Sequence, residues 1–94
     1  MPELHLTTKL SRAPEVLYSS LADDEGVLLS MQAGFYFSLN KTAVVVWNAL
    51  ESECTLEELA KRLSRDFKVT PEQAASDLKT LLAEMIGRKL VLEK

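Results

Sequence analysis

The chain has 94 residues, of which 47% are hydrophobic and 27% charged, with a formal net charge of −3 and a sequence pI near 5.1. This length suits one domain with a small core and excludes an active-site cleft between two domains. The mild acidity argues against nucleic-acid and anionic-membrane partners, which favour a basic surface. One cysteine excludes an internal disulfide, and no apolar run is long enough to cross a bilayer. We therefore expect a cytoplasmic protein without a targeting segment.

The first residues mix leucines with threonine and lysine and give no firm secondary-structure signal. We predict that residues 1–13 form a mobile or loosely docked arm and that residues 14–94 form the folded domain. Pro14 marks the boundary, because the residue before a proline is biased toward extended geometry.

Three short strands are predicted next, over residues 16–21, 27–31 and 35–39. The segment 22–26 is acidic and ends in glycine, as a hairpin turn often does, and 32–34 provides a second tight turn. Parallel pairing would need crossover connections for which the chain has no room. The strands therefore form an antiparallel meander.

The apolar spacing changes its period at Asn40. Before it, apolar residues alternate with polar ones over Phe35–Leu39, as in a half-buried strand. After it, they follow the i, i+3, i+4, i+7 spacing of a helix at Ala43, Val46, Trp47 and Leu50. Asn40 is expected to cap this first helix and join it to the strand without a loop.

Two more helices have clear start signals. Thr55 and Glu58 have the spacing of a capping box, and Thr70 is followed by Pro71 at the first helical position and by Gln73. We expect the third helix to end near Ile86 with Gly87 as a left-handed cap. Residues 90–92 form a short terminal strand or tail that folds back on the sheet.

The third helix has an apolar stripe about 140° wide, broader than one packing face needs. Its members are Ala74, Ala75, Leu78, Leu81, Leu82, Met85 and Ile86. One interpretation is a helix buried between two others in a small core. The other is that Leu78, Leu81 and Met85 line a channel beside the third strand, whose free edge could accept an added peptide strand. Tyr36 would then bound pockets on the helix side.

Several segments together resemble a known family. They are 26–29, 34–40, Val46-Trp47, 55–59, Asp77-Leu78 and Leu81-Leu82. This pattern resembles the PqqD-like family, also called the precursor peptide recognition elements of RiPP biosynthesis, over about residues 16–92. The resemblance implies an α+β, winged-helix-like fold with a three-stranded antiparallel sheet followed by three helices. Phe35 departs from the family pattern, which commonly has a polar or basic residue there.

The resemblance also implies a function. Such domains are not enzymes and need no cofactor; they bind the leader of a precursor peptide and deliver it to a leader peptidase or other maturation enzyme. The pattern is most similar to the discrete recognition proteins of lasso-peptide biosynthesis, with the pyrroloquinoline-quinone type as an alternative. The expected peptide-binding residues come from the third strand and third helix: Phe35, Tyr36, Phe37, Ser38, Leu39, Asp77, Leu78, Leu81, Leu82 and Met85. The same strand edge is available for pairing two copies of the chain.

Other functions have weaker support. His5 is the only histidine and Cys54 the only cysteine, so a metal site or a Cys-His nucleophile lacks parts. The three glycines are too far apart for a phosphate-binding loop. A winged helix that binds DNA is the competing class, but its third helix should be basic, and here it is slightly acidic.

Overall fold

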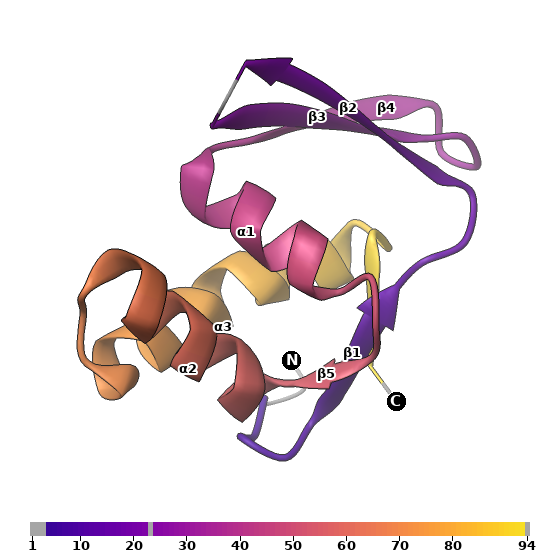
Figure 1. Cartoon of the computed structure of the whole chain (residues 1–94). Helices are drawn as coiled ribbons and strands as arrows, with labels where there is room; N and C mark the ends of the chain where they lie inside the picture. Colours follow the sequence, from indigo (N-terminus) through magenta and orange to yellow (C-terminus); the bar gives the residue numbers. More distant parts are fainter. Residues whose placement is uncertain (1–3, 23, 94) are drawn as a thin grey trace.

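The computed structural model describes residues 4–22 and 24–93, which form two small antiparallel sheets and three helices (Figure 1). The first sheet has the order β2-β3-β4, with β2 at Val16–Ala22, β3 at Glu25–Ser30 and β4 at Phe35–Leu39. The second has the order β5-β1-β6, with β5 at Cys54–Thr55, β1 at Lys9–Arg12 and β6 at Val91–Glu93. The helices are α1 (Lys41–Ala49), α2 (Leu56–Phe67) and α3 (Pro71–Gly87). The predicted meander followed by three helices is confirmed.

The meander turns one face toward the helices. Side chains alternate along each strand, and those of Leu28 and Leu39 lie in the core. Strand β3 begins two residues before its predicted start, so Gly26 lies within the strand and pairs with Ser20 and Leu39. A Cβ atom on Gly26 would lie 2.6 Å from Cε1 of Tyr18. A larger residue there would have to displace the Tyr18 ring, so glycine suits this position although the chain does not turn at it.

Asn40 joins β4 directly to α1, as predicted. Its backbone is extended, with φ −84° and ψ −177°, and its Oδ1 accepts a hydrogen bond from the amide of Ala43 at 2.9 Å. This bond satisfies one of the free amides of the first turn. The helix then buries Ala43, Val46 and Trp47, so the strand and the helix share one core.

The predicted N-caps Thr55 and Thr70 are present, but the Gln73 side chain bonds to Asp77 and not back to Thr70 as a capping box would require. Thr55 and Glu58 form a reciprocal capping box, in which Glu58 Oε1 accepts from the Thr55 amide at 2.9 Å. Thr70 Oγ1 accepts from the Gln73 amide at 3.1 Å, while the Gln73 side chain donates to Asp77. Both helices therefore begin where their sequences predict.

The expected left-handed cap at Gly87 is wrong. Gly87 is the last residue of α3, and the positive φ falls two residues later, at Lys89, where φ is 62°. The amide of Leu90 bonds to the carbonyl of Met85, and the Leu90 side chain is fully buried. The chain turns at Lys89 because this turn places Leu90 in the core.

The prediction of a mobile or loosely docked arm is also wrong for residues 4–13; residues 1–3 lie outside the described residues. Leu4 and Leu10 are buried in the core, and β1 pairs with both β5 and β6. The terminal strand folds back as expected, but onto β1 and not onto the meander. The two ends of the chain therefore close one core together.

Arg12 ties this second sheet to α1. Its Nε and Nη2 donate to the carbonyl oxygen of Trp47 at 3.1 and 2.6 Å, and its guanidinium lies 4.6 Å from the centre of the Trp47 ring. The Trp47 carbonyl lies in the last turn of α1, where carbonyls have no intrahelical partner and a nearby cation is favourable.

We expect Arg12→Ala to lower the free energy of unfolding by about 2 kcal/mol, because it removes charged hydrogen bonds and a cation–π contact. Urea denaturation would measure the change. Arg65→Ala is the matched control, since Arg65 is exposed and pairs only across the surface with Asp66; its effect should stay within about 0.5 kcal/mol. Equal effects of the two variants would contradict the anchoring role of Arg12.

The capping box predicts a pH dependence. The hydrogen bond from the Thr55 amide, and then that from its hydroxyl, lower the pKa of Glu58 below its ordinary value of 4.5. A lowered folded-state pKa stabilises the fold above the unfolded-state pKa, and this contribution is lost as the pH falls through the folded-state value. When the pH is lowered from about 6 to about 3, wild type should therefore lose more stability, measured by thermal unfolding, than Glu58→Gln does. Parallel pH profiles would show that the Glu58 charge does not contribute.

Candidate functional site

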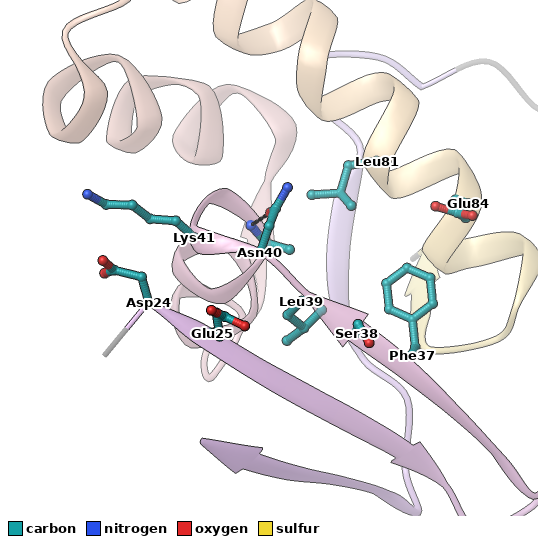
Figure 2. Close-up of a pocket in the computed structure, with 10 residues that line it drawn as sticks. Asp24, Glu25, Phe37, Ser38, Leu39, Asn40, Lys41, Leu81 and Glu84 are labelled. Atoms are coloured by element: carbon teal, nitrogen blue, oxygen red, sulfur yellow. Dashed lines mark hydrogen bonds between the residues drawn. The ribbon is translucent and has the colours of Figure 1, made fainter. Parts of the chain in front are cut away.

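A hollow lies where the end of β4, the start of α1 and the middle of α3 meet (Figure 2). Its volume is about 670 Å³. The residues that line it are Asp24, Glu25, Phe37, Ser38, Leu39, Asn40, Lys41, Ala43, Leu81 and Glu84. The Asn40 corner brings these elements together, because it leaves no loop between the strand and the helix.

One side of the hollow is an open strand edge. Strand β4 pairs with β3 along its full length, from Ser30 opposite Phe35 to Gly26 opposite Leu39. Within residues 4–22 and 24–93, its other edge has no strand partner. The main-chain N–H and C=O groups on that edge can therefore pair with an added strand.

Apolar side chains line the space between β4 and α3. Figure 2 shows Leu81 pointing from α3 toward β4, and Phe37 extending from β4 toward α3 near Glu84. Leu81 is half-buried and packs partly against the core, so an apolar guest could cover the rest of its surface. Burial of such surface is the main source of favourable binding energy in a site of this kind.

Arg88 closes one end of the space beside β4. Its guanidinium lies 5.8 Å from the centre of the Phe35 ring and 5.6 Å from that of Phe37, and it pairs with Glu84 at 3.7 Å. The end of α3 is thereby held over the first half of the strand. The hollow therefore opens toward the Leu39 end of β4.

The rim of the hollow carries more acidic than basic groups. Asp24, Glu25 and Glu84 line it together with one cation, Lys41. In Figure 2, Asp24 and Lys41 lie on the same side of the hollow, and Glu84 lies across from them. The rim therefore favours a neutral or basic guest over an acidic one.

The structure brings together four of the predicted site residues: Phe37, Ser38, Leu39 and Leu81. Phe35 lies on the same face of β4 but beneath Arg88. Asp77 is exposed on α3 and bonds to Gln73, apart from the residues that line the hollow.

Three predicted residues, Leu78, Leu82 and Met85, are fully buried in the core and offer no surface to a guest in this structure. Their burial supports the core interpretation for most of the α3 stripe. Only the side of the stripe that carries Leu81 reaches the hollow. Leu78, Leu82 and Met85 instead anchor α3 in the core.

The expected pockets between Tyr36 and the third helix are wrong. Phe35, Phe37 and Leu39 face the helices, so the alternation of the strand turns Tyr36 to the opposite face of the sheet. The Tyr36 side chain is 72% exposed there. The apolar contacts between β4 and α3 come from the two phenylalanines.

Several residues at the hollow were not predicted as site residues, namely Asn40 and Lys41, Glu84, and the acidic pair Asp24 and Glu25. A signal for three of them was available. Asn40 and Lys41 follow Leu39 directly, and Glu84 lies three positions after Leu81, which is one turn of the same helix face.

A second hollow of about 320 Å³ has a different character. Its lining residues belong to α2, α3 and the segment before β1, including Leu6, Ala60 and Ala75. Helices satisfy their own main-chain groups, so this site offers few hydrogen bonds to a peptide backbone. The hollow beside β4 is the stronger candidate for that reason.

Cys54 lines neither hollow. The Cys54 thiol donates to the carbonyls of Ala49 and Ser52, and burial, followed by the negative charge of Glu58, raises its pKa. A raised pKa makes a thiol less nucleophilic at neutral pH.

Over residues 4–22 and 24–93, no group of three His, Cys, Asp or Glu side chains could hold a metal ion. No helix in the same residues has the length and hydrophobicity to span a bilayer.

One family model and two solved structures match this chain. The model for Coenzyme PQQ synthesis protein D (PqqD) matches residues 25–91. The solved structure of TbiB1 in complex with the TbiA(beta) leader peptide is 27% identical, with a TM-score of 0.79 over 86% of this chain and 93% of that one. Lasso peptide synthetase B1 complexed with the leader peptide is 25% identical, with a TM-score of 0.72 over 88% of this chain and 96% of that one. The comparison with curated proteins finds no match.

Proposed function

This chain belongs to the PqqD family, and we propose that it takes up a precursor leader peptide as an added strand on β4. Recognition domains of this family are non-catalytic proteins that bind peptides, and both similar structures contain a leader peptide. The observation that carries the proposal is the open edge of β4 beside the hollow that Leu81 and Phe37 line.

Two kinds of contact contribute to recognition of the leader: main-chain hydrogen bonds and side-chain contacts. Main-chain hydrogen bonds along β4 are indifferent to the leader sequence, so they supply affinity without selectivity. Leader side chains alternate between the two faces of the extended sheet. Those on the helix side enter the hollow, where Phe37 and Leu81 offer apolar surface and the acidic rim disfavours acidic residues.

These contacts are sufficient for a useful affinity. A buried leucine or aromatic side chain contributes on the order of 2 kcal/mol, so two or three anchors offset much of the cost of ordering a disordered leader. Together with the backbone ladder, they bring the dissociation constant to about the micromolar range or below. Release to an enzyme remains fast at that affinity.

The pathway that we propose is lasso-peptide biosynthesis in the cytoplasm, where this chain would deliver the precursor to a leader peptidase. Its similarity to lasso peptide synthetase B1 over nearly all of both chains supports this choice. The second candidate is a pyrroloquinoline-quinone-type chaperone that presents a precursor to a radical enzyme, which the description of the matching family model favours. In either case the chain binds a peptide and does no chemistry itself.

Binding of DNA through α3 has little physical support. The exposed side chains of this helix include Glu72, Asp77 and Glu84, against Lys79. Acidic groups on a recognition helix would repel phosphates. The acidic rim of the hollow adds to that repulsion.

We expect Leu81→Asp to weaken binding of the cognate leader by roughly thirtyfold, which corresponds to the loss of about 2 kcal/mol of apolar burial. Fluorescence anisotropy with a labelled leader would measure the change. Leu92→Asp is the matched control, because Leu92 is also a partly exposed leucine but lies on β6 in the other sheet. The dissociation constant of Leu92→Asp for the leader should lie within twofold of that of wild type. In a separate competition experiment, duplex DNA should not displace the labelled leader from wild type. Unchanged binding by Leu81→Asp would place the peptide elsewhere.

Strand addition predicts an alternating pattern along the leader backbone. Only every second leader amide points at β4, so N-methylation of those amides should weaken binding about tenfold per position, whereas methylation of the intervening ones should not. A set of singly methylated peptides, titrated into the same chain, tests this. A uniform response along the peptide would exclude an added strand even if Leu81 proves important.

A further inference from the structure

The acidic pair Asp24 and Glu25 lines the hollow at the Leu39 end of β4 (Figure 2). Asp24 directly precedes β3, Glu25 is its first residue, and both are exposed. Over residues 4–22 and 24–93, neither of them forms an ion pair, whereas Glu84 across the hollow pairs with Arg88 at 3.7 Å. The negative charge of the acidic pair is therefore available to a guest.

The chain itself brings little positive charge to the acidic pair. Residues 13–40, which contain β2, β3 and β4, have four acidic residues and no lysine or arginine. The cation that lines the hollow is Lys41, and its Nζ lies 5.8 Å from the centre of the Phe67 ring on α2. Because neighbouring like charges repel each other, the acidic pair favours a cation supplied by the guest.

The strand geometry directs guest side chains toward the acidic pair. Residues opposite each other on neighbouring strands point to the same face, so leader residues opposite Phe37 and Leu39 project into the hollow. Strand β4 ends at Leu39 and the chain continues as α1, which opens a space between an added strand and the start of β3. Two strand spacings, about 10 Å, separate these strands. A long side chain is needed to cross that distance.

The walls and the rim of the hollow match the two parts of a lysine or arginine side chain. Phe37 and Leu81 offer apolar surface to the methylene stem, while the acidic pair lies at the rim, where the charged head keeps contact with water. An aliphatic side chain would cover the same walls but leave the carboxylates without a partner. A glutamate or aspartate would be repelled.

From these observations we infer that the leader taken up by this chain carries a lysine or arginine on the helix side at the Leu39 end of β4, and that Asp24 and Glu25 select this residue by its charge. The inference rests on the proposed leader-binding function and adds a feature of the leader to it. Since the main-chain hydrogen bonds of β4 are indifferent to sequence, the same charge contact fixes the register of the added strand.

A library of displayed random-sequence peptides is the probe for this charge preference. It is selected on wild type, on the double variant Asp24→Asn/Glu25→Gln and on the control Glu51→Gln/Glu93→Gln. The control changes the net charge equally, at exposed positions outside both hollows. Only peptides that lose affinity for Leu81→Asp are kept. We expect lysine or arginine to be enriched at one position with wild type and the control, and not with the double variant.

One selected peptide then measures the contact by fluorescence anisotropy. Methionine in place of the selected lysine or arginine keeps an unbranched stem and removes the charge. This change should weaken binding to wild type about fivefold and to Asp24→Asn/Glu25→Gln less than twofold. The difference should shrink as the salt concentration rises.

Each other outcome has a distinct meaning. If the selected peptides depend on Leu81 but show no enrichment of lysine or arginine, the inference is overturned and the proposed function stands. If the control variant loses the preference as fully as the double variant, net charge is the cause and the inference is wrong. If the double variant keeps the preference but melts at a lower temperature, the acidic pair only stabilises the fold, which also overturns the inference. If no selected peptide depends on Leu81, the proposed function fails first and the inference falls with it.

Discussion

The hydrogen bond from the Ala43 amide to the Asn40 side chain is the local constraint on which the rest of the site depends. It caps α1, which begins at Lys41, and Asn40 is the one residue between this helix and the end of β4 at Leu39, so no loop separates the strand from the helix. Val46 and Trp47 then fix that helix in the core. With β4 held in this way, its outer edge stays open and its Leu39 end faces α3.

The opposite wall depends on contacts that come from the ends of the chain. Leu78, Leu82 and Met85 bury α3 in the core, and Leu90 and β6 hold its end against β1. Arg12 connects this second sheet to the last turn of α1. Both walls of the hollow are therefore parts of one packed unit. A preformed site of this kind loses little conformational freedom on binding, so most of the ordering cost falls on the leader.

Local signals predicted most of the fold, and contacts between distant segments account for what was missed. The change of apolar period at Asn40 can be seen within residues 35–50, and the caps at Thr55 and Thr70 each depend on residues within four positions; all three are present. The β5-β1-β6 sheet joins residues 9–12 to residues 54–55 and 91–93, and strands that short carry no pattern of their own. The width of the α3 stripe likewise did not show which leucines the second sheet and α2 would cover. The position of Tyr36, by contrast, was already implied by the alternation that places Phe35 and Phe37 on the helix side.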